Sequence, residues 1–514
     1  MIGIILRASF GDGRLWIAGC LSLAFAGCAT IAPVPGPGEE FLVSHYILAH
    51  EDGFALSKER EPGRLTQRKL SVERARRDVE ENVFAAGIDA YLRRLWPNLD
   101  SVEPKPERPV QLLVFVHGGL NGYRDDFRRM RQMLATEDDC HRERGSVPSK
   151  LFVTAKCEHA KTAYYPVFFN WNSELWDSIG DDLFLIRFGE RSPIIALLTS
   201  PFVVASRAAE SILNAPNGLY ANFKNFDDSE FVVDWGTPLA PARVLATPVA
   251  KTFGAPAWQI MYRRADLLVS PALSVEKGTK KPHREGAAWS FLRTLERRVE
   301  VSRDGVGWWR IGNRKIPVEI TMIGHSMGSI VLNRLLAVTA QLENALPIKR
   351  VVYLAPAASV LETEMSVLPF LRSNPRARFW TFALDQKDEA RELHWSKLSP
   401  RGTLLVWIDS FFEPVTELGD KRFGRSQAFK TYYFSHGDLP ESAKENNAKG
   451  KPFNYCEWNF KSTERPTTHG AAGDPTHLEA ILWHVSAELF DRRLEPRDVP
   501  VKCSSASVSE LFSK

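Results

Sequence analysis

The sequence predicts an α/β protein with a mostly parallel sheet flanked by helices. Two observations support this prediction. Continuous apolar runs, of which Val110–Val116 is the clearest, are bounded by turn residues and have the length of strands buried on both faces. Segments of helical character follow these runs, first near residue 123 and again after residue 285. Buried strands that alternate with helices are typical of parallel sheets.

The first elements of this pattern follow a proline-punctuated linker, Glu103–Pro109. We expect a strand at Val110–Val116, a helix over residues 123–135 and a second, aromatic strand at Thr162–Trp171. Residues 39–107, before and including most of the linker, predict an irregular and helical lead-in. Its charged centre carries apolar residues too sparsely for a deep core.

The alternation stops after Trp176 for more than a hundred residues. The apolar stretch Ile194–Leu213 is broken by Pro201 and carries Arg207 and Glu210. These charges favour one or two amphipathic helices over a transmembrane span. We interpret residues 180–284 as a large insertion, a cap or lid over the carboxyl edge of the sheet. A structural buttress that packs elsewhere is the alternative.

Regular alternation resumes after residue 285. Strands are predicted at residues 317–323, 350–355 and 377–384, with helices at residues 329–341 and 360–371. Edge strands are considered at residues 403–408 and 430–434, and a final helix at residues 475–491. The strand at residues 317–323 leads directly into a glycine-rich turn.

The N-terminal segment has a different character from the rest of the chain. Arg7 and Arg14 precede the apolar run Leu15–Ala26, which has the size of a signal-peptide core and is too short to span a bilayer. The run ends at Ala-Gly-Cys28, before a tether rich in proline and glycine, and this resembles the bacterial lipoprotein processing site. The resemblance implies that Cys28 is lipidated. Cys20 is a weaker alternative, because it leaves too short a core, and a plain cleaved signal or a buried helix are the others.

These observations divide the chain into six parts. They are a lipoprotein-type signal peptide (1–28), a lead-in and linker (29–109), a first part of the core (110–179), the insertion (180–284), a second part of the core (285–495) and a tail (496–514). A lipid-anchored chain would face the periplasm of a bacterial cell envelope, an oxidising compartment. There, Cys140 and Cys157 form either a local disulfide or two free thiols, whereas the sequence separation of Cys456 and Cys503 gives by itself no argument for or against pairing them.

Composition excludes some functions. The net charge is +4, and the lysines and arginines are spread along the chain, so we expect a solvated surface and no nucleic-acid partner. No cysteine and histidine spacing resembles a zinc site, and no metal is expected. Nothing in the sequence indicates an obligate protein partner.

One motif indicates nucleophilic chemistry. Gly324-His-Ser-Met-Gly328 fits the pattern Gly-x-Ser-x-Gly, with a predicted buried strand before it and a helical run after it. In that context the glycines relieve crowding at a sharp turn, and the turn presents the serine above the sheet. Ser326 is therefore the candidate nucleophile; a glycine-rich turn with an exposed serine is the alternative.

A second motif, His117-Gly-Gly119, follows the first predicted strand. Glycines let backbone N–H groups turn towards a developing oxyanion without a side chain in the way. His117 is expected to hold this loop by hydrogen bonds and not to act as the catalytic base.

Together, the Val-x-Val-His-Gly and Gly-His-Ser-Met-Gly motifs resemble those of bacterial lipase- and esterase-like proteins of the α/β-hydrolase family. The resemblance covers residues 110–171 and 319–491. It implies an α/β-hydrolase fold, with oxyanion donors at Gly119, or Leu120, and at Met327. It also implies the chain order serine, acid, histidine. The acid then lies after the strand at residues 377–384, where Asp388 matches the family register and Asp385 is the reserve.

The histidine is expected in the loop before the final helix. Asp474-Pro475 is a helix start, which places His477 in the first turn and leaves His469 on the preceding loop. We favour His469, because a base must reach both the serine and the acid. His436 lies too early in the chain and comes third.

The expected activity is hydrolysis of a small-molecule or lipid carboxylic ester by a serine esterase or lipase-like enzyme, through an acyl-enzyme and without metal or organic cofactor. An acyltransferase would use the same residues. A noncatalytic envelope lipoprotein that keeps the fold as a binding module is the third reading.

Overall fold

The computed structural model describes residues 40–55, 83–95, 109–118, 122–135, 152–153, 164–187, 190–213, 247–271, 285–384, 389, 402–413, 415, 417–426, 428, 453–458, 478, 485 and 501–506. Within them, ten strands form one sheet. The main path runs β1-β5-β2-β10-β11-β12-β13-β14, and the hairpin of β8 and β9 pairs with β10. The strand bounds are β1 Tyr46–Leu48, β2 Val110–Val116, β5 Tyr164–Asn170, β8 Val299–Val301, β9 Gly307–Ile311, β10 Arg314–His325, β11 Ile348–Leu354, β12 Arg378–Leu384, β13 Phe453–Trp458 and β14 Val501–Ala506.

The sheet is parallel from β1 to β13, and the antiparallel pairs are β13 with β14, β9 with β10 and β8 with β9. The predicted α/β class with a mostly parallel sheet flanked by helices is therefore confirmed, and the architecture is compatible with an α/β-hydrolase fold. Two further pairs of two-residue strands lie outside this sheet: β3 Leu134–Ala135 with β4 Phe152–Val153, and β6 Ile186–Arg187 with β7 Glu190–Arg191.

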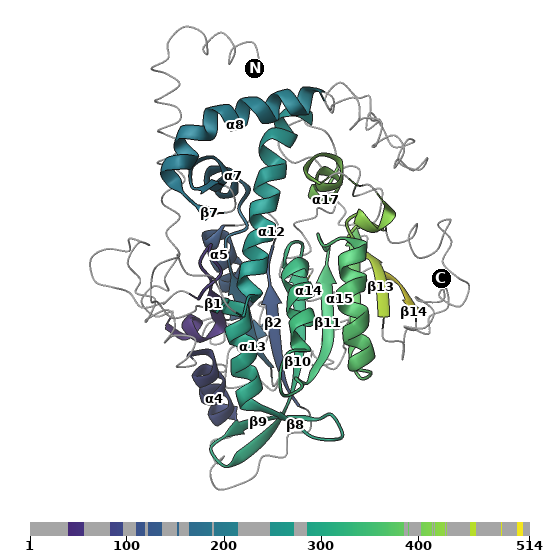
Figure 1. Cartoon of the computed structure of the whole chain (residues 1–514). Coiled ribbons are helices and arrows are strands. Elements are labelled where there is room, and N and C mark those ends of the chain that lie inside the picture. The colour runs from purple at the N-terminus through teal and green to yellow at the C-terminus, as the bar shows by residue number, and fades with distance from the viewer. Residues whose placement is uncertain are drawn as a thin grey trace.

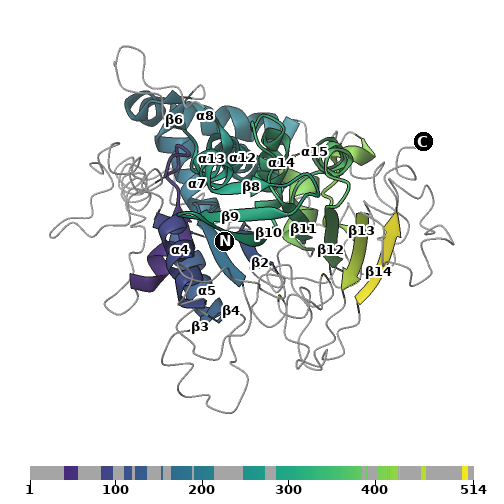
Figure 2. The ribbon, with the colours of Figure 1, turned by 90° about the horizontal axis from the view of Figure 1, so that it is seen from below.

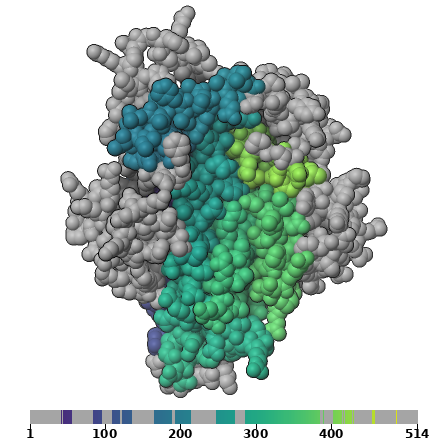
Figure 3. All heavy atoms as spheres, viewed as in Figure 1, coloured from purple at the N-terminus to yellow at the C-terminus, as the bar shows by residue number. Residues whose placement is uncertain are grey.

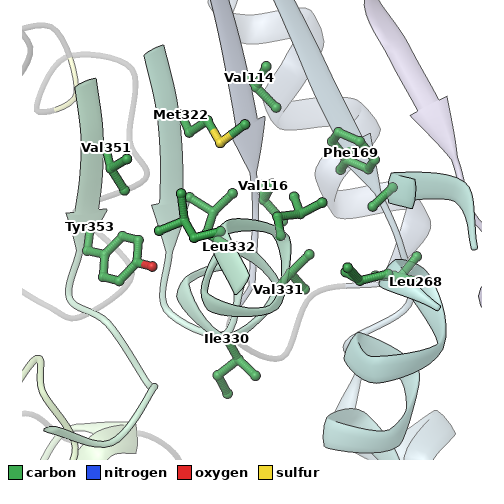
Figure 4. Packing of buried hydrophobic residues seen from close by; sticks show 14 of the residues in the cluster. Val114, Val116, Phe169, Leu268, Met322, Ile330, Val331, Leu332, Val351 and Tyr353 are labelled. Carbon is green, nitrogen blue, oxygen red and sulfur yellow. The ribbon is translucent and has the colours of Figure 1, made fainter. Parts of the chain in front are cut away.

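Helices cover both faces of the sheet (Figures 1 and 2). One face packs against α12 Ala255–Val269, α13 Ala287–Arg298, α14 Gly328–Thr339 and α15 Val360–Ser373. The other packs against α5 Tyr123–Met133, together with Leu478 and Val485. Strand β2 serves both cores, because alternate side chains point to opposite faces: Val114 and Val116 join the first cluster, and Phe115 joins the second. Figure 4 shows Val114, Val116 and Met322 of the sheet beside Val331 and Leu332 of α14.

The side of the sheet on which the next strand is added changes between the parallel neighbours β2 and β10. From β2 the chain passes through α5 to β5 on one side, whereas from β10 it passes through α14 to β11 on the other. The loops that leave the carboxyl ends of these two neighbouring strands therefore diverge. In open α/β sheets, the crevice at such a switch point is where ligands bind.

Most of the elements expected around this point are present. The strand at Val110–Val116 and the helix from Tyr123 have the predicted positions, and β10, α14, β11, α15 and β12 follow in the predicted order. The edge strand considered at residues 403–408 is wrong, because Leu404–Trp407 forms helix α17 and Ile408–Phe412 continues it as a π-helix, η4. Thr403 caps α17 by accepting a hydrogen bond from the Val406 N–H, and this favours a helix start over a strand. Residues 430–434 lie outside the described residues, and Leu478 and Val485 are the described positions of the final helix, both helical.

The lead-in contributes more than the sequence predicted. Residues Glu40–His45 form a 3-10 helix, η1, and β1 then adds a strand beside β5. Helix α4 (Val83–Leu95) buries Phe84, Ile88 and Leu92 in the main core. These residues are spaced four apart, so they form one buried helical face; the charged centre of the lead-in, residues 57–82, lies outside the described residues.

Part of the segment interpreted as an insertion packs on the sheet. Helix α7 (Leu175–Phe184) spans its proposed start at residue 180, and α8 (Pro193–Leu213) packs on α7. The π-helix η3 (Ala250–Gly254) then leads into α12, whose Trp258, Met261 and Leu268 lie in the main core. Because α12 packs beside α14, it belongs to the helical layer on the sheet and not to a cap over its edge.

The far edge of the sheet carries a disulfide. Cys456 of β13 is disulfide-bonded, and Cys503 of β14 is its direct partner in the antiparallel register. Sequence separation gave no basis for relating these two cysteines. Residues 140 and 157, the pair considered from sequence, lie outside the described residues.

Candidate active site

Ser326 occupies a strained turn between β10 and α14. Its φ of 52° lies in the left-handed region, which a residue with a side chain seldom adopts. The Ser326 N–H donates to the Leu354 carbonyl at 2.9 Å, and the Ser326 carbonyl accepts from the Ser329 hydroxyl at 2.7 Å and from the Ala357 N–H at 3.1 Å. The turn is thus tied to the end of β11, and these bonds offset the strain. Ser326 itself is buried.

Both glycines of the motif are required by close packing. A Cβ on Gly328 would lie 2.0 Å from the Val116 carbonyl oxygen at the end of β2. A Cβ on Gly324 would lie 2.9 Å from Leu332 and 3.0 Å from the Gly328 backbone. The glycines therefore let α14 start directly against β2, and this fixes the position of Ser326 at the switch point. This is the strand-turn-helix context in which a Gly-x-Ser-x-Gly motif presents its serine.

The loop after β2 touches the turn that holds Ser326. A Cβ on Gly118 would lie 2.4 Å from the Met327 nitrogen and 2.5 Å from the Gly328 nitrogen. Met327 is the N-cap residue of α14, so its N–H stands at the positive end of the helix. The structure thus brings the predicted donor Met327 beside the predicted oxyanion loop. Gly119 and Leu120, the predicted donors on that loop, lie outside the described residues.

His117 makes structural contacts of the kind expected. Its carbonyl accepts from the Trp171 indole N–H at 2.9 Å, and its Nε2 lies 3.2 Å from the Trp171 backbone nitrogen. Nε2 also contacts the Asp126 carboxylate on α5. Burial raises the pKa of Asp126, and the neighbouring His117 partly offsets this. His117 is itself buried and joins β2, α5 and the end of β5.

The loop expected to carry the acid is anchored at both ends. Leu384, the last residue of β12, forms an isolated bridge with Arg425. Glu389, which is buried, accepts the Thr403 N–H at 3.0 Å through its carbonyl, and its carboxylate lies 3.6 Å from Arg425. Residues 385–388, which include the predicted acid Asp388 and its reserve Asp385, lie between these anchors and outside the described residues.

A buried charge cluster fixes Arg425 and was not foreseen from the sequence. Asp409 on η4 accepts from Arg425 at 2.9 Å and from Arg422 at 3.1 Å, and all three side chains are buried. Arg422 also lies 3.3 Å from Glu413 and donates to the Tyr262 hydroxyl at 3.1 Å. Its pKa is raised by these negative neighbours, against the opposing effect of burial.

The same segment touches the loop that holds Ser326. The Phe423 and Gly424 N–H groups donate to the Ala358 and Pro356 carbonyls at 2.8 Å. Ala357, between those two residues, donates to the Ser326 carbonyl. A chain of backbone contacts therefore connects the turn that holds Ser326 with Arg425, which contacts both ends of the loop that includes the predicted acid.

Four predicted positions lie outside the described residues: His469, His477, His436 and Cys28. Leu478, directly after His477, is buried in the core on the α5 face. Leu478 thus packs in this core at the position that follows the candidate base His477 in the sequence.

The large apolar side chains of the stretch expected to form a lid are exposed. Leu197 and Phe202 of α8 face outwards, with Phe202 77% exposed, and Val203 is half-buried. The principal contacts of α8 are with α7, β6 and η3. These two side chains thus form no apolar wall over Ser326.

Comparison with known proteins identifies no relative. No protein-family model matches the chain, and neither a curated protein nor a solved structure matches it significantly.

Proposed function

We propose that this protein is a serine hydrolase that cleaves carboxylic esters. The observation that carries the proposal is the position of Ser326. It has a left-handed backbone on a turn that follows a buried strand and begins a helix, at the switch point of a parallel sheet. Strain of this kind persists where the surroundings enforce it, and it is concentrated at functional sites.

The proposed reaction is acyl transfer through an acyl-enzyme. The Ser326 hydroxyl attacks the ester carbonyl and passes its proton to His469, whose imidazole is oriented by Asp388. The N–H groups of Met327 and Gly119 stabilise the tetrahedral oxyanion. The alkoxide leaves with a proton from the histidine. The histidine then takes a proton from water, which attacks the acyl carbonyl, and the acid is released as the Ser326 oxygen regains its proton.

Two independent features support the proposed location in a bacterial cell envelope. Small residues before Cys28 resemble a lipoprotein processing site, and Cys456 is disulfide-bonded. Disulfides persist in oxidising compartments such as the periplasm. The first feature supports a lipid anchor and the second an oxidising compartment, so we propose a lipid-anchored enzyme of a bacterial envelope that acts on small-molecule or lipid esters.

The test is labelling with a serine-directed fluorophosphonate, followed by a panel of p-nitrophenyl esters of increasing chain length. The full chain should be labelled at Ser326, and Ser326→Ala should abolish labelling and lower ester turnover by on the order of 10⁶-fold. Ser290→Ala, on α13, is the matched control and should behave as the parent. Labelling that survives Ser326→Ala would refute the assignment.

The same assay separates the other two functions. A noncatalytic lipoprotein would show neither labelling nor turnover. An acyltransferase would be labelled at Ser326 but would transfer the acyl group to an added alcohol in preference to water.

A further inference from the structure

Helix α8 has an unusual distribution of side chains for a helix in water. Its large apolar residues face outwards: Ile194 is 75%, Leu198 69% and Phe202 77% exposed. Other exposed apolar residues continue this face to the end of the helix: Ile195, Leu197, Ile212 and Leu213. Figures 1 and 3 show α8 along the upper edge of the molecule, with its atoms at the surface in this view.

The inner face of α8 is small and polar instead. The buried residues there are Ala196, Ser200 and Ser211. Arg187, from β6, donates to the Ala196 carbonyl and the Ser200 hydroxyl, both at 3.0 Å, and to the Thr199 hydroxyl at 2.8 Å. Further along the helix, Arg207 forms an ion pair with Asp182 of α7.

These contacts, together with the half-buried Val203 and Val204, hold α8 without the help of its most exposed apolar side chains. The outermost residues Ile194, Leu198 and Phe202 therefore add little to the packing of the fold, and their exposure in water is unfavourable. A contiguous exposed apolar surface of this kind marks a contact with a partner or a membrane. The occupant must be apolar, because the outer face between residues 194 and 205 carries no charged residue.

A bilayer fits this surface better than a narrow groove would. The helix has 21 residues and, by length and composition, is apolar enough to cross a membrane, yet only 17% of its most apolar window is buried in the protein. Crossing would require breaking its buried contacts with Arg187 and Asp182. Lying in the membrane plane requires no such change and is the arrangement typical of interfacial helices.

The expected anchor points to the same occupant. Residues 29–39 separate Cys28 from the first described residue, and eleven residues span at most about 40 Å. A lipidated Cys28 would therefore keep the folded body close to a bilayer.

We propose that α8 docks in the plane of a lipid bilayer, with Leu198 and Phe202 inserted at the boundary between headgroups and acyl chains. The contact is apolar and requires neither anionic lipid nor catalysis. It is thus independent of the function proposed for Ser326.

Photocrosslinking tests this contact locally. The full chain carries Cys28→Ser, which removes the lipid, and Phe202→p-benzoylphenylalanine, and it is mixed with vesicles of phosphatidylcholine. We expect lipid adducts several-fold above those from the same probe at Arg310, an exposed position on β9. Adduct formation should persist at high salt and in the Ser326→Ala variant.

A matched pair of variants tests which side chains matter. Leu198→Ser should lower adduct formation several-fold, whereas Met365→Ser should not, although Met365 on α15 is equally exposed at 69%. Adducts to a second copy of the chain would instead identify a dimer surface and overturn the proposal. So would adducts no more abundant than at Arg310, or adducts that require anionic lipid or disappear in salt.

Discussion

Gly118 lies against Met327, so closely that a Cβ on the glycine would be 2.4 Å from the Met327 nitrogen. This contact joins two loops that are more than two hundred residues apart in sequence. It places the predicted oxyanion loop beside the first N–H group after the candidate nucleophile. The geometry of the proposed oxyanion hole therefore depends on the absence of a side chain at residue 118.

Gly118→Ala should lower kcat/KM by about 100-fold or more, because the loop must move away from Met327 and the oxyanion donors lose their alignment. Gly122→Ala is the control, since a Cβ there meets mainly the movable carboxylate of Glu174. Steady-state kinetics on one ester would show the contrast. Equal activity of the two variants would remove this loop from the mechanism.

The acid assignment is tested by two amide substitutions. Asp388→Asn should reduce turnover by about 10⁴-fold, because only the true acid holds the histidine in the reactive tautomer. Asp385→Asn should have a much smaller effect. Ester kinetics and circular dichroism of both variants decide the matter, and the opposite ranking would transfer the role to Asp385.

The base is tested in the same way. His469→Ala should nearly abolish hydrolysis, whereas His477→Ala should retain most of it, because we expect His469 on the loop that reaches Ser326. The pH dependence of kcat/KM gives a second readout, since loss of the base removes the acidic limb of the profile. Greater damage from His477→Ala would reverse the assignment.

Asp409→Asn should destabilise the protein by about 3–5 kcal/mol, because two buried guanidinium groups lose their shared carboxylate. Turnover should fall as well, since Arg425 contacts both ends of the acid loop. Urea unfolding measures the first effect and ester kinetics the second. Asp266→Asn, which removes an exposed ion pair with Arg334, should cost less than about 1 kcal/mol. A cost equally small for Asp409→Asn would mean that the cluster is not needed.

Cys28→Ser should convert firm membrane attachment into attachment that a buffer wash reverses. The lipid is then lost, and only the apolar contact proposed for α8 remains. Metabolic labelling with a fatty acid and fractionation of a bacterial host measure both consequences. Label that persists in Cys28→Ser would contradict lipidation at this cysteine, and attachment that still resists washing would indicate an uncleaved N-terminal helix.

The order of strands and helices around Ser326 was predictable because its signals are local. A continuous apolar run such as Val110–Val116 specifies a strand buried on both faces. Two glycines spaced around Ser326 indicate a tight turn wherever a strand precedes it and a helix follows. The sequence by itself therefore determined the fold class, the sharp turn at Ser326 and the loop opposite it.

Tertiary packing decided what no local pattern could specify. Asp409 and Arg425 contact each other because α17, η4 and the chain after them fold back on the end of β12, and nothing in their spacing predicts this. Cys456 meets Cys503 only through the antiparallel register of β13 and β14. The face that α8 turns outwards was likewise hidden, because its composition predicts a helix but not its buried side. That side is selected by Arg187, whose hydrogen bonds require small and polar neighbours and leave the large apolar residues facing away from the core.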